Sequence, residues 1–412
     1  MKIKVLFILL SLLFINESKA ILYPTAYKEA TKIDMKKYKT ISFDSLIEDI
    51  SCTRLDKNIF SNCISMTQYK DNLYFMGNTI AGKNIVIYNS SGKFINEITF
   101  SDALLVNSMC IVPHLEELWA VSRFKIINKF KLDGTPINRI SLPFACAHII
   151  PVDKQNYLIY SGGGCDKQGN IDGYFMALTD FKSINKFFIP KWGKSKRPYA
   201  DYNLYATNTK SNNIFIFPNN IDTIYTYNYN EKEVNPLYSL DFHEEFITKE
   251  NYPNDNELGE IIKKQKYIYS HNSFYQASDK LFFKLKGKRE DICIINLKNN
   301  SLYSCERLFD NFHSRSMNPI IGSDGENIYM LAWEKDLVEH YQNIKCSYPA
   351  IKKILPSLSA NSEDWVLITI KIIYEKYSYI SHHFVLLSNF MFGYNAKTAN
   401  RTFERSYNSS GK

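Results

Sequence analysis

The chain repeats one pattern about six times: an apolar strand, a polar turn, an aromatic-rich strand, a variable stretch, a β-rich strand, a turn and a last strand. Four strands per unit, at a spacing of roughly 40 to 65 residues, are typical of a β-propeller blade, whereas a β-sandwich would lack this recurring four-strand pattern. The sequence therefore predicts an all-β fold, a six-bladed β-propeller with short helical insertions and a C-terminal tail. The copies begin near Cys63, Ser108, Cys146, Tyr202, Asn272 and Asn318.

Two segments outside the clear repeats also have strand character. Residues 39–55, KTISFDSLIEDISCTRL, precede the first repeat, and WVLITIKIIY at 365–374 follows the start of the sixth. Because an open ring would expose strand edges that pair with other chains, we expect the N-terminal segment to complete the last blade. Residues 243–266 and 334–356 depart from the strand pattern and predict helices on a propeller face, since neither is long enough to form a core.

The first twenty residues resemble a cleaved secretory signal in their organisation. Two lysines precede an apolar run of about 11 residues, which is shorter than the roughly 18 that a membrane-spanning helix needs. Ser18 and Ala20 are the small residues that a signal peptidase requires. We therefore expect residues 1–20 to be removed, a propeller over 21–375 and a separate tail over 376–412. The mature chain is expected to contain no membrane span.

The charge and composition do not indicate a nucleic-acid-binding stripe. Residues 1–20 hold three Lys and one Glu, so their removal lowers the net charge from +8 to about +6. The lysines alternate with acidic residues and form only short clusters, such as KWGKSKR at 191–197, so we expect no nucleic-acid partner. The 29 Tyr and 27 Phe favour strands.

Several whole-blade phrases indicate a family. They are the opening SLIEDISCTRLDKN, the blade phrases DNLYFMGN and IVIYNSSGKFINEI, the phrase PNNIDTIYTYN, and PIIGSDGENIYMLAWEKDL before helical sequence. With the signal sequence, these make residues 39–375 similar to the six-bladed β-propeller proteins exported by Bacteroides-type bacteria. The resemblance implies an exported propeller in the periplasm or at the cell surface. Many relatives are lipoproteins, but this chain lacks the lipid-accepting cysteine, and its first cysteine is Cys52.

A ligand site is expected around one mouth of the central channel, where the innermost strands of the repeats begin. Polar and aromatic side chains that converge in a concavity form the usual binding site, although they can also simply solvate a water-filled channel. The candidate ligand-binding residues are His148, Tyr202, His271, His313, Arg315 and Asn318. Trp192, Tyr199 and Trp333 are candidates for stacking on sugars.

The eight cysteines leave several alternatives open. Cys293 and Cys305 flank the turn KNNS, so a hairpin would bring them close to opposite positions, as a disulfide or as free buried thiols. Cys63, Cys110 and Cys146 occupy nearly equivalent places in three repeats, which suits packing, a disulfide or, less favourably, a thiolate metal site.

The segment YSGGGCDKQGNIDG at 160–173 lacks the Lys-Ser/Thr ending of a phosphate-binding loop, so we interpret it as a loop between blade strands. Asp166 and Asp172 offer oxygen ligands to calcium, but without the spacing of an EF-hand.

The sequence contains no linear catalytic motif, so we predict no catalytic residues, no metal site and no cofactor. The favoured function is a secreted binding module of the bacterial cell envelope, a monomer that recognises a glycan or an envelope protein at the channel mouth. The alternative is a propeller hydrolase or lyase that acts on a saccharide or lactone. In that alternative, His148, His271 or His313 would act in acid-base catalysis or bind a metal.

Overall fold

The computed structural model describes residues 29–57, 60–79, 82–100, 106–161, 174–190, 204–208, 213–218, 221–247, 264–312 and 320–374. The chain divides into two compact units, Met1–Ile372 and Ile373–Lys412, and all the described helices and strands belong to the first. The predicted tail over 376–412 lies outside the described residues, as does the predicted signal sequence.

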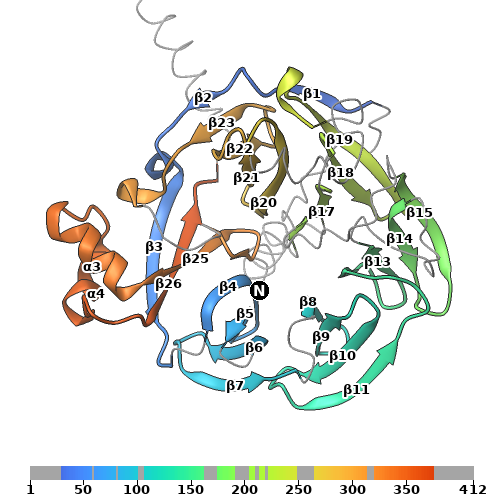
Figure 1. Ribbon diagram of the computed structural model, residues 1–412, viewed down its shortest axis with the longest axis horizontal. Coiled ribbons are helices and arrows are strands. Elements are labelled where there is room, and N and C mark those ends of the chain that lie inside the picture. The colour runs from blue at the N-terminus through green and yellow to red at the C-terminus, as the bar shows by residue number, and fades with distance from the viewer. Residues whose placement is uncertain are drawn as a thin grey trace, which may run out of the picture. The chain divides into compact units, whose positions relative to one another are not determined.

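The first unit contains six mainly antiparallel sheets arranged as the blades of a ring, as Figure 1 shows, which confirms the predicted fold class. Each blade is numbered from its first strand after residue 57. Blade I is β4 (Phe60–Tyr69), β5 (Asn72–Thr79), β6 (Gly82–Asn89) and β7 (Phe94–Ile98). Blade II is β8 (Val106–Val112), β9 (Glu117–Ser122), β10 (Ile126–Lys131) and β11 (Pro136–Ser141). Blade III is β12 (His148–Pro151), β13 (Tyr157–Tyr160), β14 (Tyr174–Thr179) and β15 (Ile184–Pro190).

The other three blades each include a strand from the N-terminal segment. Blade IV is β16 (Tyr205–Asn208), β17 (Asn213–Ile216), β18 (Thr223–Asn228) and β19 (Glu233–Asp241), with β1 (Thr31–Asp34) at its edge. Blade V is β20 (Ile268–Ala277), β21 (Lys280–Gly287), β22 (Ile292–Asn296) and β23 (Leu302–Cys305), with β2 (Lys39–Thr40) at its edge. Blade VI is β24 (Gly322–Ser323), β25 (Asn327–Trp333), β26 (Trp365–Ile372) and β3 (Ile47–Arg54).

Strand β3 closes the ring, as residues 39–55 predicted. It pairs antiparallel with β26, so that Ser51 lies opposite Thr369 and Ile50 lies opposite Ile370. Strands β1 and β2 add in parallel to the outer strands of blades IV and V, which the sequence did not predict. The N-terminal segment therefore joins three consecutive blades before the chain enters blade I.

The helical insertion of blade VI is also confirmed. Helices α3 (Glu334–Asn343) and α4 (Pro349–Ile354) connect β25 to β26, and Figure 1 shows them at the outer side of blade VI rather than on a propeller face. Leu337 and Ile351 are fully buried and attach the helices to the blade core. Of the predicted helix over 243–266, the described part contains only a short 3-10 turn at His243–Glu245, and residues 248–263 lie outside the described residues.

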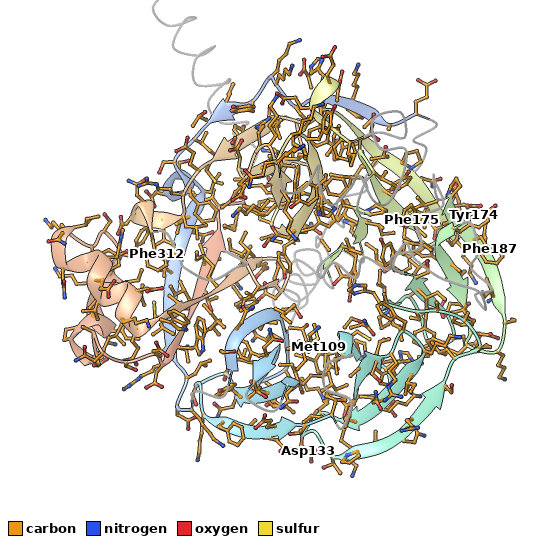
Figure 2. All side chains as sticks on the ribbon, viewed as in Figure 1. Met109, Asp133, Tyr174, Phe175, Phe187 and Phe312 are labelled. Carbon is orange, nitrogen blue, oxygen red and sulfur yellow. The ribbon has the colours of Figure 1, made fainter. Side chains whose placement is uncertain are left out.

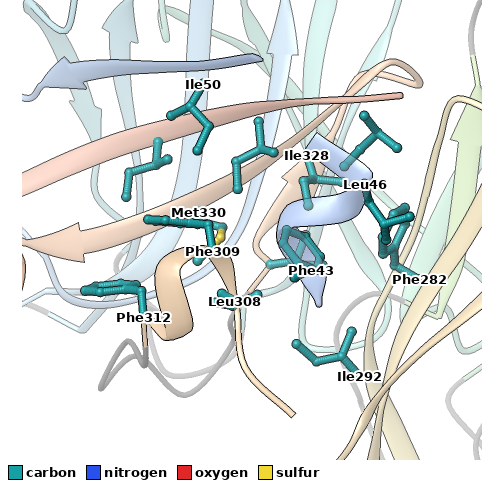
Figure 3. Close-up of a cluster of buried hydrophobic side chains, with 14 of the residues drawn as sticks. Phe43, Leu46, Ile50, Phe282, Ile292, Leu308, Phe309, Phe312, Ile328 and Met330 are labelled. Atoms are coloured by element: carbon teal, nitrogen blue, oxygen red, sulfur yellow. The ribbon is translucent and has the colours of Figure 1, made fainter. Parts of the chain in front are cut away.

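The core lies between neighbouring blades. Six clusters of buried apolar side chains correspond to the six interfaces of the ring, because the strand side chains alternate between the two adjacent blades. Figure 3 shows the cluster between blades V and VI, where Phe43 of the N-terminal segment packs among Phe282, Ile328 and Met330. Burial of Phe43 and Ile50 there gives the ring closure a hydrophobic driving force as well as hydrogen bonds.

The seven described cysteines are free thiols. Cys293 lies opposite Ser304 and Ile292 lies opposite Cys305, so the two cysteines are one residue out of register. Side chains one residue apart along a strand point to opposite faces of the sheet, and the two thiols accordingly belong to different interblade clusters. The hairpin therefore does not place Cys293 opposite Cys305.

Candidate functional site

A cavity of about 830 Å³ occupies the centre of the ring, and all six blades contribute to its lining. Most of the lining residues come from the innermost strands β4, β8, β12, β16, β20 and β24, and from the turns in which these strands end. Strands β5 and β17 and the turn after β18 contribute the others, which are Met76, Asn213, Ile214 and Tyr229. Met109 of β8 illustrates the position of such a residue, on the central edge of blade II (Figure 2). The cavity thus extends towards the ends of the innermost strands, whereas the sequence predicted a site where those strands begin.

The structure places two of the six predicted site residues. His148 of β12 lines the cavity, and its ring lies edge-on to those of Tyr160 and Tyr205, with centroids 5.9 and 6.0 Å away. His271 of β20 is buried between blades and is not among the cavity-lining residues. Tyr202, His313, Arg315 and Asn318 lie outside the described residues. The ligand-binding role of all six stays a prediction.

His271 has an environment that keeps it neutral. Its ring stacks on Phe217, with centroids 3.8 Å apart and planes 4° from parallel, and its Nε2 donates to the main-chain oxygen of Phe217 at 2.8 Å. Burial lowers the pKa of His271 to about 3, because a charged imidazole would lose its hydration there. These contacts indicate a structural link between blades IV and V.

Two buried tyrosines of neighbouring blades line the cavity. Tyr205 of β16 and Tyr275 of β20 both line it. Burial raises the pKa of Tyr275 well above its usual value, with Cys63 of blade I and Tyr205 of blade IV as its electrostatic neighbours. Burial likewise raises the pKa of Tyr205, whose neighbours are Cys110 and Cys146 of blades II and III. Both hydroxyl groups therefore remain protonated at neutral pH.

Buried polar atoms at the same place have no partner. Among the described residues, neither the Tyr275 hydroxyl nor Gln276 Oε1 makes a hydrogen bond. Tyr275 is 8% exposed and Gln276 is 2% exposed, and both line the cavity. The Gln276 amide is held by its Nε2, which donates to the main-chain oxygen of Ser278 at 3.1 Å. An unpaired buried polar group costs about 1–3 kcal/mol, and neither of these two atoms is accessible from the cavity.

Part of the cavity lining is aliphatic. Met66, Met76 and Met109 of blades I and II and Ile150 of blade III are among the lining residues and are buried. Methionine is unbranched and polarisable, so these side chains can adapt to apolar groups of different shapes. The same blades also contribute polar residues, such as Gln68, so the lining mixes apolar and polar groups.

The carboxylates at the rim of the cavity accept hydrogen bonds from the main chain of their own turns. Asp153 Oδ1 accepts the N–H groups of Gln155 and Asn156, at 2.7 and 2.8 Å. Burial alone would raise the pKa of Asp153, but these hydrogen bonds lower it below its usual value.

Asp324 repeats this arrangement in blade VI. It accepts the N–H groups of Glu326 and Asn327, at 2.9 and 2.7 Å, and the hydroxyl of Tyr329 at 2.8 Å. Burial opposes ionisation here too, and the hydrogen bonds outweigh it, so the pKa of Asp324 is lowered. Both carboxylates therefore fix turns and leave few acceptor positions for a ligand.

The remaining sequence candidates do not form a site in the described residues. Cys63, Cys110 and Cys146 pack in interblade clusters, in agreement with the packing alternative. The described residues contain no group of three or more His, Cys, Asp or Glu side chains placed to hold a metal. Trp333 packs against Trp365 at the end of β25, with centroids 5.3 Å apart. Trp192, Tyr199, Asp166 and Asp172 lie outside the described residues.

Sequence reasoning missed Tyr205, Tyr275 and Gln276. Tyr205 and Tyr275 follow the asparagines at 203 and 272 by two and three residues, in the same strand of two successive repeats. This shared position in the repeat indicated that both tyrosines lie near the channel. It could not show which end of the channel would be hollow, because this depends on the combined side-chain volumes of six strands.

Within the described part of the chain, neither α-helix is long and apolar enough to cross a membrane.

Comparisons with known proteins agree with the fold. A crystal structure of an exported protein from Bacteroides fragilis NCTC 9343 superposes with a TM-score of 0.66 at 16% sequence identity. The match covers 84% of this chain and 100% of that protein, and at this identity it shows the fold alone. No protein with curated annotation matches the chain. A family profile described as "6-bladed beta-propeller" matches residues 25–330. The chain therefore belongs to this family of six-bladed β-propellers.

Proposed function

We propose that the protein is a secreted binding module of the bacterial cell envelope, acting as a monomer in the periplasm or at the cell surface. Its ligand is a glycan or a segment of an envelope protein, bound at the central channel. The cavity of about 830 Å³ lined by all six blades supports this most directly. Pockets of roughly 300–1,000 Å³ that combine apolar walls with a few polar groups are the usual sites for small ligands.

The closed ring suits this function. Because β3 pairs with β26, the six innermost strands are held in a fixed arrangement, and a preformed site loses little conformational entropy when it binds. The alternative hydrolase or lyase relied on three histidines. Of these, His148 lines the cavity, His271 is buried elsewhere with a pKa of about 3, and His313 lies outside the described residues. These positions favour the binding module.

A thermal-shift screen of residues 21–412 against glycans and envelope-protein peptides tests the proposal. A ligand at a hundred times its Kd stabilises the folded state by about 2.7 kcal/mol, which a melting curve resolves. Thr207→Trp fills the cavity from β16 and should abolish the shift, whereas Thr135→Trp, in an exposed turn of blade II, should preserve it.

A combined alanine variant at Tyr202, His313, Arg315 and Asn318 tests the predicted channel mouth. Loss of binding in this variant alone would place the site at the predicted mouth. A screen without any saturable shift would contradict the binding function.

A further inference from the structure

We infer that Cys52 of β3 and Cys346, in the connection between α3 and α4, form a disulfide that fastens the ring-closing strand to the helical insertion of blade VI. In the structure both are half-buried thiols. The inference goes beyond the binding function and takes from it only the exported location, because disulfides persist in oxidising compartments.

The helical insertion covers the face of β3 on which Cys52 lies. Side chains two residues apart on a strand share a face, so Ile50, Cys52 and Arg54 point the same way. Arg54 forms an ion pair with Glu334, the first residue of α3. Helix α4 contacts β3, and the two lie side by side in Figure 1. The Cys52 thiol is therefore directed at the insertion rather than at blade I.

The segment that carries Cys346 is held against the N-terminal segment. Cys346 Sγ donates to the main-chain oxygen of Tyr348 at 3.4 Å. The Tyr348 hydroxyl in turn donates to Asp44 at 2.6 Å, and Asp44 lies in the 3-10 turn η1 (Phe43–Leu46), which leads directly into β3. Cys52 and Cys346 also pack against the same hydrophobic cluster, between blades V and VI. Segments almost 300 residues apart in the sequence thus bring the two thiols to one place.

The electrostatics agree with this geometry. Burial raises the pKa of the Cys52 thiol to about 12, and Cys346 is the charged-group neighbour that raises it further. Cys52 therefore stays protonated at neutral pH, so we expect exchange to begin at Cys346 and to be completed by Cys52.

The oxidant is itself a disulfide, either glutathione disulfide or the disulfide of an envelope oxidoreductase. The Cys346 thiolate attacks one of its sulfurs, forms a mixed disulfide and releases one thiolate. The Cys52 thiolate then attacks the Cys346 sulfur and releases the second. Two protein thiols are oxidised by two electrons, one external disulfide is reduced to two thiols, and the two cysteine protons pass to the released thiolates.

Cys110 and Cys146 provide an internal comparison. They are also electrostatic neighbours, but both are buried in the cluster between blades II and III. An external disulfide cannot reach either thiol in the folded protein, so we expect this pair to stay reduced.

The test is oxidation of folded residues 21–412 with glutathione disulfide, followed by alkylation under denaturing conditions and peptide mass spectrometry. We expect a peptide that joins Cys52 to Cys346, lighter by two hydrogen atoms than the separate peptides, while Cys110 and Cys146 are alkylated. Because the oxidant is supplied, the result does not depend on export. A negative result would overturn the inference and leave the proposed function standing.

A stability measurement provides a second readout. The link encloses a loop of about 290 residues, so oxidation should raise the urea midpoint by about 0.5–1 M. Cys346→Ser should abolish this gain, whereas the matched control Cys110→Ser should keep it. Full alkylation of Cys52 and Cys346 after oxidation, a link from either to another cysteine, or an equal gain in Cys346→Ser would overturn the inference.

Discussion

Covalent linkage of β3 to β26 should stabilise the protein strongly if the N-terminal strand closes the ring. Ser51 and Thr369 lie opposite each other in this antiparallel pair, and Cα atoms at such positions are about 4.5–5.5 Å apart, within the range of a disulfide. We propose Ser51→Cys with Thr369→Cys in a Cys52→Ser background, so that the neighbouring thiol cannot compete. Air oxidation of the folded protein should form the cross-link.

The expected magnitude follows from the length of chain enclosed. The disulfide closes a loop of about 320 residues, for which the chain-entropy relation gives about 6 kcal/mol, and engineered disulfides usually deliver less, so we expect about 2–5 kcal/mol. Urea unfolding of the oxidised and reduced variant measures this difference.

Ser51→Cys with Lys371→Cys is the matched control for this cross-link. Lys371 lies opposite Asp49, so the two new cysteines are diagonal neighbours about 7–8 Å apart and should not cross-link. If the Ser51/Thr369 variant stays reduced, or if the control cross-links equally well, the closure argument is wrong.

Two further predictions concern buried polar groups. Asp279 and Lys280 are ion-paired at 2.6 Å, with side chains 0% and 1% exposed, and Lys298 lies 3.1 Å from the same carboxylate. Asp279→Asn should therefore lower the free energy of unfolding by about 3–5 kcal/mol, because it removes the charged partner of a buried lysine. Glu233→Gln, which breaks the exposed ion pair with Lys186, should change the free energy of unfolding by less than about 1 kcal/mol. Similar urea midpoints for the two variants would refute the distinction between the buried and the exposed ion pair. For His271, the folded-state pKa of about 3 lies below the unfolded value, so the unfolded state gains a proton first as the pH falls and stability is lost between about pH 6.5 and 3. Between pH 6.5 and 4.5 this loss of stability amounts to about 2 kcal/mol, which His271→Leu should lack, and identical pH profiles of wild type and variant would contradict it.

Most of the fold could be predicted because its determinants are local. The alternation of apolar and polar residues, together with turns such as Asp133-Gly134, identifies the four strands of a blade, and the number of repeats gives the number of blades. The strand character of residues 47–54 was enough to predict ring closure, because a closed ring needs an N-terminal strand that pairs with the last blade.

The parts that could not be predicted depend on register and on short pairings. Strands β1 and β2 contain four and two residues, too few for a periodicity to be visible. The turn between β22 and β23 sets the one-residue offset between Cys293 and Cys305, and this offset places the two thiols on opposite faces of the sheet.

The candidate site was predicted only in part, for a similar reason. His148 was found because it begins an innermost strand, and it does line the cavity. Tyr275 and Gln276 line the cavity near the end of β20, whereas the sequence predicted site residues where the innermost strands begin.

A crystal structure of residues 21–412 with the glycan or envelope-protein peptide that gives the largest saturable thermal shift would test the central claim most directly. We predict the ligand in the central cavity, in contact with lining residues such as His148 and Tyr205. A cavity that holds only water at saturating ligand, or a ligand bound elsewhere on the ring, would contradict it.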